Sequence, residues 1–146
     1  MIKRRPLILV VDDDETLLKT IHDTLSAEGF RVITASEGIG AVFQLAKRNP
    51  DLIILDIMMP KYDGFQTLET IRIHSDVPVI MLTCLDDRFS LHKSLDEGKA
   101  DGYITKPFSL KYLVAQVKAK LRRTDYLQKQ FICDENKNIE MLRIER

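Results

Sequence analysis

Acidic side chains follow two separate apolar runs in this sequence. Asp12 and Asp13 come directly after "LILVV" (7–11), and Asp56 closes "DLIILD" (51–56). Carboxylates held close together repel one another, since two unit charges ~4 Å apart cost roughly 4 kcal/mol at an effective dielectric constant of 20. A hard divalent cation relieves this repulsion, and carboxylate oxygens with water suit Mg²⁺. The acids therefore predict a Mg²⁺ site, provided that the fold brings them together.

A hydroxyl group and a lysine stand at the ends of two further apolar runs. Thr83 ends "VPVIMLT" (77–83), and Lys106 follows "DGYIT" (101–105). Because the residue before a proline is held in an extended conformation, the backbone ahead of Pro107 can aim the ammonium group of Lys106. For a lysine alone a surface position is the simpler interpretation, and the neighbouring proline favours a functional one.

The next two acids, Asp14 and Glu15, have a simpler explanation. They open a helical pattern whose apolar residues include Leu17, Leu18 and Ile21. The dipole of a helix favours negative charge in its first turn, so these two acids are expected to cap the helix. A single acid at a strand end usually has such a role, whereas two strands that deliver acids to one edge are harder to explain by capping.

Short apolar runs alternate with amphipathic stretches along the whole chain. Strands are predicted at 6–11, 31–35, 51–56, 77–83 and 101–105, and helices from 15 to before 29, around 41–46, after 64, over 86–97 and over 109–123. This alternation predicts a parallel sheet with helices on both faces. Parallel strands end at one edge, where ligands bind. If the first strand lies beside the third, this edge gathers Asp12, Asp13, Asp56, Thr83 and Lys106.

The composition is that of a single soluble globular domain. Of 146 residues, 45% are hydrophobic and 30% charged, and Lys+Arg and Asp+Glu balance at 22 each. This balance gives no electrostatic reason to expect a nucleic-acid-binding surface, and no apolar run approaches the ~20 residues of a membrane span. The two cysteines, Cys84 and Cys133, are expected to be free thiols in a reducing cytoplasm.

Four segments carry a resemblance to a known family. They are "LILVVDDDE", "PDLIILDIMMPKYDGF", "VPVIMLT" and "ADGYITKPF", and together they resemble the signature segments of the response-regulator receiver domain (CheY-like). The similarity runs from about residue 6 to residue 123. It implies a doubly wound α/β fold, flavodoxin-like, with five parallel strands in the order 2-1-3-4-5 and five helices, the strand order for which CheY is a well-known example.

The resemblance also implies roles for the acidic residues. Asp56 would accept a phosphoryl group from a phosphohistidine on a sensor histidine kinase or a phosphotransfer protein. Asp13 would bind Mg²⁺ directly and Asp12 mainly through water, with Asp56 and the backbone carbonyl of Met58 as further ligands. A carboxylate can act as such a nucleophile, and positioning with charge neutralisation does most of the work in phosphoryl transfer.

Three further residues would respond to the phosphoryl group in a protein that resembles this family. Lys106 would pair with the phosphoryl oxygens, Thr83 would donate a hydrogen bond to them, and Tyr103 would swing inward behind Thr83. The chain would have no enzymatic activity apart from its own phosphorylation and a slow self-dephosphorylation. The slowness is expected because Met58 and Leu85, two residues past Asp56 and Thr83, cannot position an attacking water.

One segment departs from the family pattern. "EGKADGY" carries one residue more than usual, most simply Lys99. The predicted places of Tyr103 and Lys106 therefore depend on whether the loop before the fifth strand absorbs the extra residue.

A second departure concerns the face formed by the fourth helix, fifth strand and fifth helix. OmpR/PhoB-type regulators typically dimerise there through salt bridges, but this chain carries Leu91, Gly102, Tyr112 and Gln116 at the best-matching positions and retains only Asp101 and Arg123. Little stability need be lost, since exposed ion pairs contribute only ~0–1 kcal/mol each. Either an apolar homodimer forms there on phosphorylation, or the face is solvated.

The sequence thus predicts a receiver domain over 1–123 and a linker or tail over 124–146, with the start of a truncated effector domain as the alternative for this last segment. Phosphorylation would control an output partner, with transcription as the expected output. DNA would be contacted only through an effector domain outside this sequence, and no membrane partner is expected.

Two other readings compete with the phosphorylation switch. One is a pseudo-receiver that binds proteins without being phosphorylated. The other is a metal-dependent phosphatase, which would need a second acid two residues past Asp56, where the chain has Met58.

Overall fold

The strands form one parallel sheet, as the sequence predicts. The computed structural model describes residues 4–59, 63–84 and 99–124. Its strands are β1 (Leu7–Val11), β2 (Arg31–Ala35), β3 (Leu52–Asp56), β4 (Val79–Cys84) and β5 (Gly102–Lys106). Their order is β2-β1-β3-β4-β5 with every neighbouring pair parallel, which confirms the predicted doubly wound topology.

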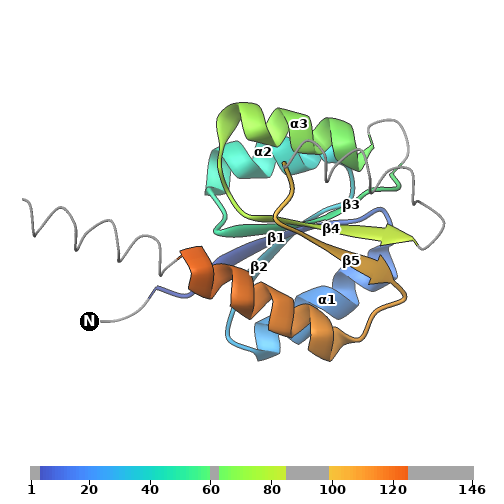
Figure 1. Cartoon of the computed structure of the whole chain (residues 1–146), viewed down its shortest axis with the longest axis vertical. Coiled ribbons are helices and arrows are strands. Elements are labelled where there is room, and N and C mark those ends of the chain that lie inside the picture. The colour runs from blue at the N-terminus through green and yellow to red at the C-terminus, as the bar shows by residue number, and fades with distance from the viewer. Residues whose placement is uncertain (1–3, 60–62, 85–98, 125–146) are drawn as a thin grey trace, which may run out of the picture.

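Helices cover both faces of this sheet. They are α1 (Glu15–Ala27), α2 (Gly38–Arg48), α3 (Gly64–His74) and a further helix at 110–124. Figure 1 shows α2 and α3 on one face and α1 with the helix at 110–124 on the other. The helix expected at 86–97 lies outside the described residues. In the part of the chain that the structure describes, no helix is both long and apolar enough to cross a membrane.

The sheet separates two apolar cores, and its central strands contribute to both. Every residue of β1 and β3 is buried, because helices cover both of their faces. The β5 strand differs: Ile104 is its only buried residue, and Gly102 has no side chain to pack. Burial therefore fixes the alignment of β1 and β3 far more firmly than that of β5.

The cap of α1 follows the prediction. The side chain of Asp14 accepts hydrogen bonds from the backbone N–H groups of Thr16 (3.0 Å) and Leu17 (3.2 Å). Glu15 lies exposed in the first turn of α1. Among the acids that follow β1, these two therefore serve the helix, and only Asp12 and Asp13 remain for the sheet edge.

Candidate functional site

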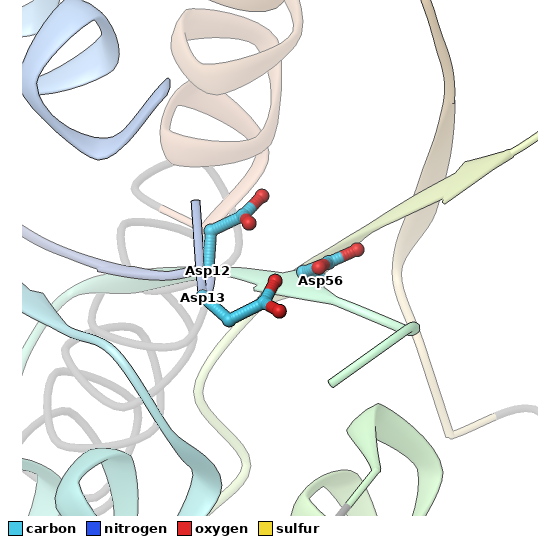
Figure 2. Close-up of side chains that lie close together, drawn as sticks. All are labelled: Asp12, Asp13 and Asp56. Atoms are coloured by element: carbon cyan, nitrogen blue, oxygen red, sulfur yellow. The ribbon is translucent and has the colours of Figure 1, made fainter. Parts of the chain in front are cut away.

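Three carboxylates meet at the carboxyl edge of the sheet. The β1 and β3 strands are neighbours with Val11 opposite Leu55, so the residues that follow them lie side by side. Carboxylate oxygens of Asp12, Asp13 and Asp56 lie within 4.8 Å of one another. Figure 2 shows the three groups extending from the strand ends toward the same region. The convergence predicted from the sequence is therefore present.

The three acids differ in their exposure to solvent. Asp12 is 0% and Asp56 2% exposed, whereas Asp13 is exposed. Short backbone contacts hold the buried pair: Asp12 Oδ1 accepts the N–H of Asp14 (3.0 Å), and Asp56 Oδ1 accepts that of Met58 (3.3 Å). The cluster thus combines two fixed carboxylates with one that faces solvent.

Lys106 extends from the end of β5 into this cluster. Its Nζ lies 2.9 Å from Oδ2 of Asp12 and 3.3 Å from Oδ1 of Asp56. Burial acts against the charged ammonium, but the hydrogen bond with Asp12 and the charges of Asp56 and Asp12 outweigh it and raise the pKa of Lys106 above its usual value. The lysine therefore stays charged and partly neutralises the buried acids. Lys106 thus lies in the cluster to which the sequence analysis assigns it.

The same environment makes Asp56 a weak acid. Burial, followed by repulsion from Asp12, raises the pKa of Asp56 from 3.8 to about 6, although Lys106 and the N–H of Met58 lower it in part. At neutral pH the group is ionised but poorly compensated. A further positive charge at this point is favourable, and the hard oxygen donors of the cluster fit a Mg²⁺ ion.

The other residues predicted for this site lie around the cluster. Thr83 is buried at the end of β4, where its Oγ1 donates a hydrogen bond to the carbonyl of Cys84 (3.2 Å). Tyr103 of β5 is partly buried against the core beneath α2 and α3, so its ring already lies inward. The side chain of Met58 is 59% exposed beside Asp56.

The residues predicted for a partner face are only partly described. Leu91 lies outside the described residues, as does Leu85. Tyr112 is 50% exposed and Gln116 is partly buried on the helix at 110–124, and Arg123 is exposed. The carboxylate of Asp101 instead faces its own chain, at 2.9 Å from a guanidinium nitrogen of Arg72.

Two residues near the site were missed in the sequence. Nothing in the sequence marks Arg72 as special, because an arginine near the end of a helix is common. Gly64 could have been recognised, since a glycine directly after Asp63, the cap residue of α3, indicates a close approach of backbone. A Cβ at Gly64 would collide with the carbonyl oxygen of Asp56 and lie 2.6 Å from Cα of Ile57. The start of α3 therefore lies directly against the strand end that carries Asp56.

We expect Gly64→Ala to lower the free energy of unfolding by about 1–3 kcal/mol, the usual cost of overpacking. The atoms that it meets belong to backbone, which cannot move aside. Urea denaturation measures this loss. Gly40→Ala in α2 is the matched control, because its Cβ would meet only Cβ of Ala35 at 3.6 Å. In a helix that change stabilises by roughly 0.5–1 kcal/mol, and equal effects of the two would contradict the close approach.

Comparison with known proteins gives a consistent result. The family model described as "Response regulator receiver domain" matches residues 8–118. A "Probable transcriptional regulator ycf27" of Galdieria sulphuraria is 40% identical over 146 residues, which are 99% of this chain and 57% of that protein. The "DNA-binding response regulator MtrA" of Mycolicibacterium paratuberculosis is 41% identical over 121 residues, 83% of this chain and 53% of that protein.

Solved structures agree with these matches. The receiver domain of the Francisella response regulator 1452 superimposes with a TM-score of 0.75 at 35% identity, over 82% of this chain and 99% of that one. The chain spans about half the length of the curated relatives it matches. Since the family profile covers most of the sequence and the sheet order and acidic edge agree with it, the chain belongs to the response regulator receiver domain family of two-component systems.

Proposed function

We propose that Asp56 is the phosphoacceptor of this receiver domain and that Mg²⁺ binds beside it. The observation that carries the proposal is the cluster itself: Asp12, Asp13 and Asp56 within 4.8 Å of one another, with the ammonium group of Lys106 in contact. Solvent reaches the exposed Asp13, and the buried pair is fixed by backbone contacts. This arrangement suits a reaction in which positioning and charge neutralisation dominate.

The chemistry assigned to Asp56 is a nucleophilic substitution at phosphorus. A carboxylate oxygen of Asp56 forms the new O–P bond while the P–N bond of a phosphohistidine breaks, and the electron pair of that bond remains on the departing imidazole. The ammonium group of Lys106 moves from the carboxylates to the phosphoryl oxygens. Asp12, Asp13, Asp56 and the carbonyl of Met58 would hold Mg²⁺, which would supply further positive charge at this site.

The modification places about −1.5 to −2 charge and strong acceptor oxygens at the sheet edge. The Thr83 hydroxyl, which donates to the carbonyl of its neighbour Cys84 in the structure, would turn to these oxygens, and Tyr103 lies behind it on β5. A change at these two residues would be transmitted to β5 and the helix at 110–124, on the face where the sequence predicts a partner. There it would control an output partner, including a second copy of the chain.

The relatives suggest what this output is. They are described as transcriptional and DNA-binding regulators, and we extend to this chain the role of a cytoplasmic receiver that takes its phosphoryl group from a histidine kinase or phosphotransfer protein. Residues 1–123 would form the receiver, and 124–146 would lead toward an effector domain that contacts DNA. Apart from its own phosphorylation and dephosphorylation, the domain would catalyse no reaction.

The test is to incubate the protein with Mg²⁺ and acetyl phosphate and to weigh it intact by mass spectrometry. One phosphate adduct should form, should require Mg²⁺, and should be absent from Asp56→Asn. The control Asp63→Asn changes a nearby acid that caps α3 and should leave the adduct in place. A folded, Mg²⁺-loaded protein without an adduct would contradict the proposal and favour the pseudo-receiver.

We expect the phosphorylated form to lose its phosphate slowly, because the exposed thioether of Met58 cannot orient a water molecule for attack. Met58→Glu adds an acceptor there and should shorten the half-life of the adduct about tenfold or more, in line with the contribution of a positioned base. Intact-mass spectra taken at intervals after removal of acetyl phosphate measure this half-life. Met58→Leu is the control, and equal half-lives of the two variants would argue against the explanation.

A further inference from the structure

The alignment of β5 decides whether Lys106 reaches the acidic cluster. In a parallel ladder a shift by one residue turns every side chain to the opposite face. It would replace Lys106 by Thr105 or Pro107, neither of which carries a charge. Burial protects β5 less than β1 and β3 against such a shift, because only Ile104 is buried, Tyr103 is partly buried and Gly102 has no side chain. Polar contacts are therefore expected to help fix this alignment.

Asp101, the residue before β5, makes the contacts that could do so. Its N–H donates to the carbonyl of Val79 (2.9 Å), and its Oδ2 accepts the N–H of the same Val79 (2.8 Å). Val79 is the first residue of β4. Asp101 thus binds both the backbone N–H and the backbone C=O of Val79. These contacts lie directly before Ile80 and Gly102, the first residue pair of the β4–β5 ladder.

Arg72 holds Asp101 in this position from α3. One guanidinium nitrogen contacts Oδ2 of Asp101 (2.9 Å), and the Nε donates to the carbonyl of Lys99 (2.7 Å). The remaining nitrogen donates to the carbonyls of Val77 (2.6 Å) and Ser75 (3.3 Å). The planar guanidinium group holds its N–H donors in a fixed geometry, so one arginine can make all of these hydrogen bonds at once. Because the side chain of Arg72 is only 18% exposed, these contacts are partly shielded from water.

Lys99, two residues before Asp101, is held at two points. Arg72 binds its carbonyl, and its Nζ lies 3.6 Å from Oε1 of Glu69, less than one turn earlier on α3. The chain is therefore fastened to α3 just before it enters β5.

From these contacts we infer that the Arg72–Asp101 clamp is a positioning device for Lys106. It fixes the alignment of β5 on β4 and so delivers the ammonium group to Asp12 and Asp56, which lie at the other end of the strand. Neither residue of the clamp touches the acids. The effect on phosphorylation rests on the function proposed above, whereas the effect on the charge of the cluster does not.

The first experiment measures Mg²⁺ affinity by titration of the metal-free protein at pH 7.5, with intrinsic tyrosine fluorescence or NMR shifts as the signal. Removal of the ammonium group in Lys106→Met should tighten Mg²⁺ binding at least about fivefold, the effect of one unit charge ~4 Å away even in water. Arg72→Met should tighten it in the same direction. The double variant should bind no tighter than Lys106→Met alone, since both changes remove the same charge from the cluster.

A purely structural role of Arg72 predicts a different pattern. Arg72→Met would then lower the urea midpoint but leave the Mg²⁺ affinity of the folded protein unchanged to within about twofold, and this result would overturn the inference. If Arg72→Met does not fold, Arg72→Lys keeps the charge without the fork and is expected to show the same tightening. Glu28→Ala, which removes an exposed ion pair with Lys118, is the matched control and should change neither quantity appreciably.

The second experiment follows phosphorylation by acetyl phosphate in the same variants. Arg72→Met should slow formation of the adduct about 10- to 100-fold, the cost of a misplaced group. The double variant should form the adduct no more slowly than Lys106→Met alone. Independent, multiplying losses would contradict the inference. If the wild-type protein forms no adduct, the proposed function fails, and the Mg²⁺ titration still decides the role of the clamp.

Discussion

Replacement of Asp56 by asparagine is expected to stabilise the metal-free protein at pH 7.5 by up to about 3 kcal/mol, the equivalent of its shift in pKa. The carboxyl has a pKa of about 6 in the folded chain against 3.8 as its ordinary value, because it is buried beside Asp12. Ionisation therefore costs more in the folded state than in the unfolded one. Asparagine has nearly the same shape and no charge, so this cost disappears.

The dependence on pH identifies the cause. Between about pH 3.8 and pH 6 the unfolded chain releases the proton of Asp56 while the folded chain retains it. The free energy of unfolding that this group contributes is thus fully present below this window and is lost as pH rises through it. Urea denaturation in EDTA at pH 4, 5, 6 and 7.5 should show the gap between Asp56→Asn and wild type opening with pH. Asp76→Asn, an exposed acid outside the cluster, should show no such gap.

Replacement of Lys106 by methionine should act in the opposite direction. It leaves Asp12 and Asp56 buried without their cation, and breaking a buried pair in this way costs about 3–5 kcal/mol. We expect that loss of the free energy of unfolding in EDTA at pH 7.5, and a smaller one at pH 5, where protonation of Asp56 relieves the repulsion. Urea denaturation measures both.

Mg²⁺ should restore most of the free energy of unfolding that the Lys106→Met variant loses. A ligand that binds only the folded state stabilises it in proportion to the logarithm of its concentration over its dissociation constant, and the variant has the more negative site. The stabilisation by Mg²⁺ should therefore be larger for Lys106→Met than for wild type, and smaller for Asp56→Asn. Lys118→Met, which removes a half-exposed partner of Glu28, should cost no more than ~1 kcal/mol. Equal losses at the two lysines would show that Lys106 does not compensate the acids.

The sequence alone predicted the fold to within a residue or two at most element ends. The apolar runs are long and uninterrupted where both faces of a strand are covered, as in β1 and β3, and the cap at Asp14 marks the start of α1 clearly. Strand order could not be read from periodicity. It came from the resemblance of the motifs to a family, and the structure has that order.

The candidate site was predictable for the residues at strand ends and unpredictable for those that act across the fold. Asp12, Asp13 and Asp56 follow directly from where parallel strands stop. The clamp of Arg72 on Asp101 did not, because its geometry depends on how α3 lies against the approach to β5. For the same reason the sequence does not show that the carboxylate of Asp101 is bound within the chain, and a role of this residue in a partner face stays a prediction.

The cation and the acids of the cluster lie far apart along the chain. Lys106 pairs with Asp12 across 94 residues, an interval that a ribosome takes about 5 to 20 seconds to synthesise. Over the last 50 residues of that interval, from Asp56 to Lys106, the nascent chain contains both strands that carry the acids but not the lysine that pairs with them. Pairing of β1 with β3 would then bury two negative charges with no internal counterion. The addition of β5 thus completes both the sheet and its charge balance, which makes it the natural last step of folding during translation.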